Sequence, residues 1–331
     1  MDLRCAVVAT GAQQSPNQDT IPGRQRGRMA TLTLGRVRLP ALRGFAIAHP
    51  IATFLLLTFS IAYPLMTLVA LAARGLIPGS GALERLPVPP DEVAGLFLTL
   101  GALLPAALYV TWAAEGRPGI MRLVRRITSW RFGLRWWLVI LTALPLLTVA
   151  WGLLLGDSLR PVDPVRLVLQ QIPLLLTNVL LVNLWEEMAW AGIMQTRLER
   201  RHNLFVAALI TAVPFAFAHW PLALFAPTLN ASSVLTPLPG YLLLGALVRP
   251  LFGLMLRATG NSLLAVALTH SMFNRTQNPN GIAVSLLEGE GYRLGVLIML
   301  VAMIAVLALG LRKKLSRRYR QQLDGTLPSG S

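Results

Sequence analysis

The sequence is poor in charged residues, lysine and cysteine. Only 13% of its 331 residues are charged, Lys313 and Lys314 are its only lysines, and Cys5 is its only cysteine. A soluble protein of this length needs a polar surface around its core, and so few charges cannot provide one. A single cysteine forms no disulfide within its own chain. The composition therefore excludes an ordinary soluble enzyme and a disulfide scaffold, and the 54% of hydrophobic residues excludes a disordered chain.

Acidic residues are also scarce, and this gives the chain a strong positive charge. There are 14 Asp and Glu against 30 Lys and Arg, for a net charge of +16. Such a charge often indicates nucleic-acid binding. Here, however, most of the arginines flank long apolar segments, which is the pattern of a polytopic membrane protein with positive cytoplasmic loops. We therefore expect a lipid bilayer as the surroundings and no nucleic acid as a partner.

Eight apolar stretches approach the length of about 20 residues that a helix needs to cross a bilayer. They are residues 51–73, 93–114, 136–155, 167–190, 203–224, 240–256, 261–278 and 293–311. A backbone in lipid must satisfy its own hydrogen bonds, and none of these stretches alternates with period two, so we expect helices. The predicted fold class is all-α, a polytopic membrane protein with a bundle of about eight transmembrane helices.

The basic residues also predict the orientation of this bundle. With the N-terminus inside, the inner segments hold 23 Lys and Arg and the outer loops hold six. The positive-inside rule then places both termini in the cytoplasm. The excess of Arg over Lys favours a GC-rich bacterial genome, so the predicted location is a bacterial cytoplasmic membrane.

Two carboxylates lie inside a predicted span. All six Asp lie outside the spans, and of the eight Glu only Glu186 and Glu187 lie within one. A carboxylate in a membrane is costly and indicates a functional site, although an ion pair between helices would also explain it. His219 and His270 lie in two further spans, where a histidine commonly bonds to a neighbouring helix. Asn274 follows His270 by four residues and so shares its helical face.

These residue types suit the hydrolysis of a peptide bond inside the membrane. Glu186 and His219 can take a proton from water, and His270 and Asn274 can donate hydrogen bonds to the oxyanion that forms. Other chemistries lack their residues. No span holds an Asp for an aspartyl protease, no two His stand four apart in an H-E-x-x-H motif, and no helix carries Gly-x-Ser-Gly.

Three short motifs resemble those of the CPBP family, the CAAX proteases and bacteriocin-processing enzymes also called the ABI family. Residues 186–192, EEMAWAG, are similar to the family's E-E-x-x-x-R-G signature. Phe215 to His219 resembles its F-x-x-x-H motif, and His270 to Asn274 resembles its H-x-x-x-N motif. Each motif alone is weak, but together they stand in the right order on three separate spans. The resemblance covers roughly residues 165–280.

This resemblance implies an intramembrane endopeptidase of the glutamate type, with assigned residues and no cofactor. The first Glu and first His of the family, here Glu186 and His219, activate water, with Glu187 as a supporting acid. The second His and the Asn, here His270 and Asn274, form the oxyanion hole. Zinc is the alternative, because Glu186, His219 and His270 make up a set of the kind that binds catalytic zinc. We favour the metal-free version because the three come from three helices without a local spacing.

One position departs from the family pattern. Ala191 stands where the family has Arg, four residues after Glu187, at the spacing of a helical ion pair. Arg249 is the only basic residue well inside a predicted span. Our hypothesis is that it replaces the missing partner of Glu187, and the alternative is that it snorkels to the membrane surface.

The resemblance also divides the chain into regions. They are a disordered basic cytoplasmic arm with Met29 as an alternative start (1–45), three spans (46–165) with an amphipathic surface helix (118–135), a CPBP-like catalytic core (166–280), a last span (281–311) and a basic cytoplasmic tail (312–331).

The predicted substrate is a peptide or a membrane-associated protein. Two other functions remain open from the sequence. One is a proton-coupled transporter whose buried Glu and His relay protons, although the chain shows no internal repeat. The other is a catalytically inactive immunity or scaffold protein of the same family, which the loss of Arg at Ala191 favours.

Overall fold

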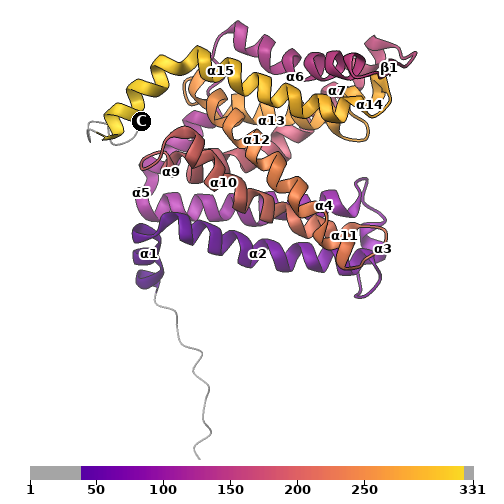
Figure 1. Cartoon of the computed structure of the whole chain (residues 1–331). Helices are drawn as coiled ribbons and strands as arrows, with labels where there is room; N and C mark the ends of the chain where they lie inside the picture. The colour runs from indigo at the N-terminus through magenta and orange to yellow at the C-terminus, as the bar shows by residue number, and fades with distance from the viewer. Residues whose placement is uncertain (1–38, 324–331) are drawn as a thin grey trace, which may run out of the picture. The chain divides into compact units, whose positions relative to one another are not determined.

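The structure, a computed structural model, describes residues 39–323, which are almost entirely helical (Figure 1). In chain order the elements are α1 (Leu39–Ala48), α2 (Pro50–Ala73), α3 (Ser80–Leu83), α4 (Pro90–Leu96), η1 (Phe97–Leu103), α5 (Leu104–Ile127), α6 (Leu134–Leu154), β1 (Ser158–Leu159), α7 (Pro164–Thr177), η2 (Asn178–Asn183), α8 (Leu184–Ala189), η3 (Trp190–Gln195), α9 (Thr196–Leu198), α10 (Leu204–His219), η4 (Trp220–Phe225), α11 (Ala231–Leu235), α12 (Pro237–Ala258), α13 (Leu263–Gln277), α14 (Ile282–Leu286), β2 (Leu287–Glu288) and α15 (Gly291–Leu323). The predicted all-α membrane fold is confirmed.

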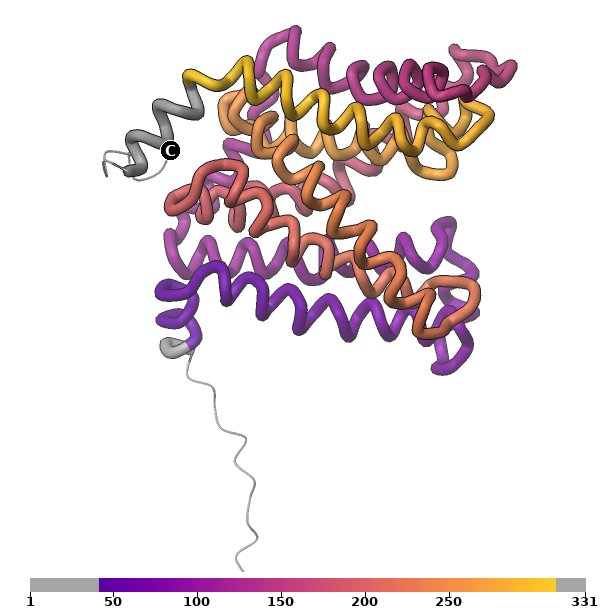
Figure 2. The backbone as a smooth tube through the Cα atoms, viewed as in Figure 1, coloured from indigo at the N-terminus to yellow at the C-terminus, as the bar shows by residue number. Residues whose placement is uncertain are grey.

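The long helices lie in three groups (Figures 1 and 2). α2 and α5 pack together on one side, and α6 and α15 pack together on the other. Between them lie α8 and α10, which contact the first group, α12, which contacts the second, and α13, which contacts both. The helices that carry the predicted site residues are therefore the central ones, shielded by neighbours on two sides.

Seven helical stretches in the described residues are long and apolar enough to cross a membrane. They match the predicted spans, with one exception. The predicted span 261–278 is α13, which has only 15 residues, or about 22 Å of helix. This is less than the hydrocarbon thickness of about 30 Å. α13 is mostly buried in protein, so it does not need to match the bilayer.

The two ends of α13 nevertheless lie at opposite ends of the bundle. Ser262, at its start, donates a hydrogen bond to the carbonyl of Ser129, in the connection between α5 and α6. Beyond its other end, Asn280 accepts a hydrogen bond from Gln171 of α7. Over residues 39–323 the chain thus runs along the bundle eight times, in the seven long stretches and in α13, which is short and mostly buried.

The bundle has one end that is rich in arginine. Figure 1 shows α1, α9 and the C-terminal part of α15 at this end, and α3, α11, α14 and β1 at the other. We call the first the Arg-rich end, because the arginines of residues 117–135 and 197–201 lie in or next to the last turns of α5 and α9 and at the start of α6. At the opposite end β1 pairs with β2, and the carboxylate of Asp157 accepts the backbone N–H groups of Gly291 and Tyr292 at the start of α15.

Two predicted segments differ from the structure. Most of the predicted disordered arm, including Met29, lies outside the described residues, but residues 39–45 are helical because α1 packs on α5 and buries Ala46. The predicted surface helix 118–135 is the part of α5 that follows a break at Gly116, where φ is 61°. It ends at Ile127, and residues 128–133 form a non-helical connection before α6.

Candidate functional site

The paired carboxylates sit on α8, a short helix between two wider π-helical turns. The chain from Pro164 to Leu198 runs through α7, η2, α8, η3 and α9 without leaving a helical path. π turns are frequent at functional sites, since they redirect the side chains that follow them. Glu186 and Glu187 are 3% and 0% exposed, so both carboxylates lie in the interior.

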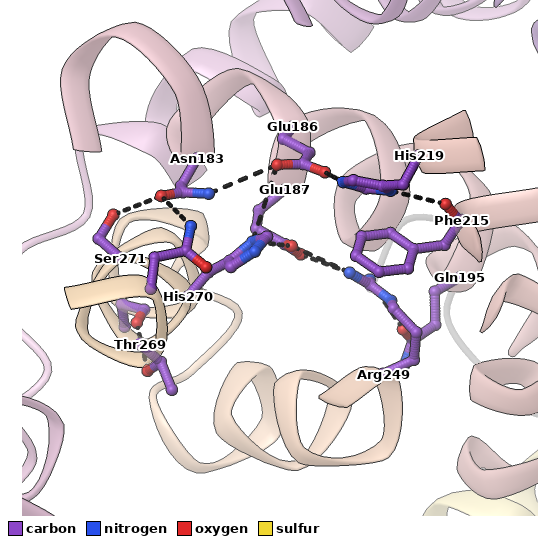
Figure 3. A network of polar contacts seen from close by, with 12 residues as sticks. Asn183, Glu186, Glu187, Gln195, Phe215, His219, Arg249, Thr269, His270 and Ser271 are labelled. Atoms are coloured by element: carbon purple, nitrogen blue, oxygen red, sulfur yellow. Dashed lines mark hydrogen bonds and ion pairs between the residues drawn. The ribbon is translucent and has the colours of Figure 1, made fainter. Parts of the chain in front are cut away.

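Glu186 faces His219 across the boundary between α8 and α10. The Oε1 atom of Glu186 lies 3.4 Å from Nε2 of His219. The other ring nitrogen, Nδ1, is 2.8 Å from the carbonyl oxygen of Phe215, to which it donates (Figure 3). In the neutral ring Nε2 is then an acceptor, and it faces an acceptor oxygen. A shared proton or a water hydrogen is needed between them.

Glu187 faces the opposite way and joins α12 to α13. Its two carboxylate oxygens lie 3.0 and 2.9 Å from Nη1 of Arg249, and Oε1 also lies 2.9 Å from Nδ1 of His270. His270 is 3.9 Å from Glu186 as well. The two carboxylates and the two imidazoles, predicted from three spans, are therefore brought together in one cluster.

Arg249 is fully buried and does not snorkel to a surface. Its guanidinium lies 5.5 Å from the ring centres of Phe215 and Phe252, and its Nη2 donates to Gln195 at 3.2 Å. Gly253 makes room for this arrangement, because a Cβ there would lie 2.2 Å from the Gln195 amide nitrogen. The structure thus contains the ion pair between Arg249 and Glu187 that we predicted in place of the family Arg.

Asn183 was missed by the sequence argument, although it connects the site. Its Nδ2 donates to Glu186 at 3.4 Å, and its Oδ1 accepts from Ser271 at 2.8 Å (Figure 3). The amide of Asn274 lies 3.5 Å from the same oxygen. Asn183 and Ser271 are both fully buried. A polar side chain one turn before the Glu pair in an apolar run was the signal that could have identified Asn183.

Replacing Asn183 by Leu is expected to lower both stability and any activity that depends on Glu186. The change leaves the buried hydroxyl of Ser271 without its acceptor, which costs about 1–3 kcal/mol. It also removes the hydrogen bond that Asn183 donates to Glu186, so that carboxylate can shift. A shift of about 1 Å in a reacting group can lower the rate roughly a hundredfold. Unfolding in mixed detergent micelles measures the first effect. Asn178→Leu is the control, because the Asn178 side chain donates only to the carbonyl of Leu174, one turn earlier, among the described residues. An equal loss of stability in both variants would contradict the role assigned to Asn183.

The suggested zinc ligands do not fit together as a metal site. Among the residues that the structure describes, no three His, Cys, Asp or Glu side chains converge as a metal site requires. The His270 nitrogen that faces Glu186 is already hydrogen-bonded to Glu187 at 2.9 Å. His219 therefore has a nitrogen directed at Glu186, whereas the His270 nitrogen nearest Glu186, Nδ1, is engaged by Glu187.

A comparison with protein families found a match in the central part of the chain. Residues 168–276 match the family described as type II CAAX prenyl endopeptidase Rce1-like. This segment is similar to that family. The predicted resemblance to the CPBP and CAAX protease family is confirmed, and at the level of the family it supports protease activity. A comparison with curated proteins gave no match.

The matched segment contains all five predicted site residues and also Asn183 and Arg249. It begins in α7 and ends in α13, so it supplies the whole central group of helices. α2, α5, α6 and α15 lie outside the match, and they enclose it. The cluster is therefore a property of the matched segment, which the flanking helices bury.

His219 and Asn274 are partly exposed, whereas the Glu pair and Arg249 are buried.

Proposed function

We propose that this protein is an intramembrane endopeptidase in which Glu186 and His219 activate water. The observation that carries this proposal is the buried Oε1 atom of Glu186, which faces His219 Nε2 and makes no hydrogen bond to any described residue. A buried carboxylate oxygen without a donor is costly, and a water molecule that donates to it removes that cost. The same water is then held beside two bases.

The proposed reaction is a single hydrolysis. Glu186, with His219 opposite, accepts one proton of the water while the water oxygen bonds to the carbonyl carbon of the substrate. The carbonyl π electrons move to oxygen and form the oxyanion. When the intermediate collapses, the C–N bond breaks and the proton passes to the leaving nitrogen. The products are one new carboxylate end and one new amine end.

His270 and Asn274 are proposed as the oxyanion donors. Because Nδ1 of His270 is held by Glu187, its Nε2 is the nitrogen that would meet the substrate. The Asn274 amide is only weakly engaged at 3.5 Å, so it can turn to the oxyanion.

Incubation of the purified full-length protein with a peptide library, with and without a chelator, tests this function. We expect cleavage, and we expect the chelator to leave its rate within about twofold, because no step uses a metal. The expected substrate is a peptide or a membrane-associated protein. Complete loss of activity with the chelator, restored by zinc, would contradict the metal-free mechanism. No cleavage, together with proton-coupled uptake of a solute, would identify the transporter instead.

A further inference from the structure

A cavity lined by charged side chains lies apart from the candidate site, between α5 and the η3–α9 segment. Its volume is about 270 Å³. Five arginines and one carboxylate line it: Arg122, Arg125, Arg126, Arg197, Arg200 and Glu115. The charged side chains of the lining thus carry a net charge of +4. The cavity lies toward the Arg-rich end, because Arg125 and Arg126 close α5 and Arg200 follows α9.

Three of these arginines are held in place. Glu115 is 2.5 Å from both Arg122 and Arg197, so one carboxylate positions two guanidinium groups. Arg126 donates to the carbonyl of Asn261 at 3.2 Å and lies 3.4 Å from the carbonyl of Gly192. A cationic site that is already ordered loses less entropy when an anion binds than a flexible one does.

The other two arginines carry charge that no acid in the lining neutralises. Arg125 and Arg200 are both exposed, and neither forms an ion pair with any residue that the structure describes. Since Glu115 is the one carboxylate in the lining and already serves Arg122 and Arg197, an anion from outside the chain is the available partner.

A buried hydroxyl gives a second, independent indication of a ligand. Thr111 lines the cavity and is only 1% exposed, yet its Oγ1 has no hydrogen-bond partner among the described residues. A buried polar atom without a partner costs about 1–3 kcal/mol. An oxygen-rich ligand that enters between the arginines would supply that partner.

The surroundings place the cavity at the depth of lipid headgroups. The connection that follows α5 carries Trp130 and leads to Trp136 and Trp137 at the start of α6. Tryptophans concentrate at the interface between the membrane and water. Basic pockets between transmembrane helices at this level bind the headgroups of anionic lipids.

We propose that this cavity binds a phosphate group, supplied by the headgroup of an anionic phospholipid. Arg125 and Arg200 neutralise the phosphate, Arg126 and Arg197 donate from fixed positions, and the Thr111 hydroxyl donates to a phosphate oxygen. This site is separate from the proposed catalytic residues and does not depend on the proposed function.

Binding of short-chain lipids to the full-length protein in detergent tests this proposal. Dihexanoyl phosphatidylglycerol should raise the Tm, and dihexanoyl phosphatidylcholine should not. The double variant Arg125→Gln, Arg200→Gln should raise the half-saturating phosphatidylglycerol concentration roughly thirtyfold, because each arginine contributes a factor of about five. Thr111→Val should weaken binding by about fivefold without lowering the Tm of the lipid-free protein.

The double variant Arg85→Gln, Arg160→Gln is the matched control, because both arginines are exposed at the opposite end of the bundle. It should bind phosphatidylglycerol as the unmodified chain does. A parallel titration with inorganic phosphate shows whether the phosphate comes from a lipid or is free. If inorganic phosphate raises the Tm as much as phosphatidylglycerol does, and the increase also depends on Arg125 and Arg200, the phosphate site is supported with free phosphate as its ligand. No Tm increase with either compound, or an increase that is the same in both double variants, would overturn the proposal.

Discussion

Replacing Glu186 by Gln is expected to reduce kcat/KM for peptide cleavage by about 10³–10⁴ while the protein still folds. A general base contributes up to about 10⁴ in rate, and an amide cannot take a proton from water. Folding should survive because Gln keeps the shape of Glu and still offers an oxygen to the Asn183 amide. His219→Ala should cost about 10²–10³, since it removes the second base beside the water.

Glu84→Gln is the control for this experiment. Glu84 is exposed, lies at the end of α3 and is far from the site along the bundle. Cleavage by initial rates and folding by gel filtration should be measured on all variants. If Glu186→Gln cleaves as fast as Glu84→Gln, the proposed role of Glu186 is wrong, even if the protein proves to be a protease.

Replacing Arg249 by Met is expected to destabilise the protein by about 3–5 kcal/mol. The change leaves the fully buried carboxylate of Glu187 without its cation, and breaking a buried pair on one side has a cost of this size. Gln195 loses a donor at the same time. The measurement is unfolding in mixed detergent micelles, together with folded yield.

The double variant Glu187→Gln, Arg249→Met separates pairing from packing. When both charges are removed no unpaired charge is left, so most of the lost stability should return. Gln can still accept from His270, which keeps that ring in place. Unchanged yield and activity in the single variant would show that Arg249 does not compensate for Ala191. Equal destabilisation in the single and double variants would show that Arg249 acts by filling space.

The sequence was informative wherever a property depends on the order of residues along one helix. Hydropathy predicted the helical spans and the membrane fold, because crossing hydrocarbon requires about 20 apolar residues and a backbone that bonds to itself. It also singled out Glu186 and His219, because an ionisable group in such a run is costly and so rarely accidental. The limits of the surface helix were less accurate, since hydropathy does not show the break at Gly116 or the end of α5 at Ile127.

Only the packing of helices decided which side chains meet. That Glu187 is shared by Arg249 and His270, and that Asn183 holds Glu186, depends on how α8, α12 and α13 cross. Arg249 and His270 lie 62 and 83 positions from Glu187, and Asn183 lies in a π turn. No local periodicity therefore encodes these contacts. The chain by itself determined that a bundle of helices would bury a few charges. The tertiary structure paired them, because an isolated charge in a low-dielectric interior is stable only beside its counter-charge.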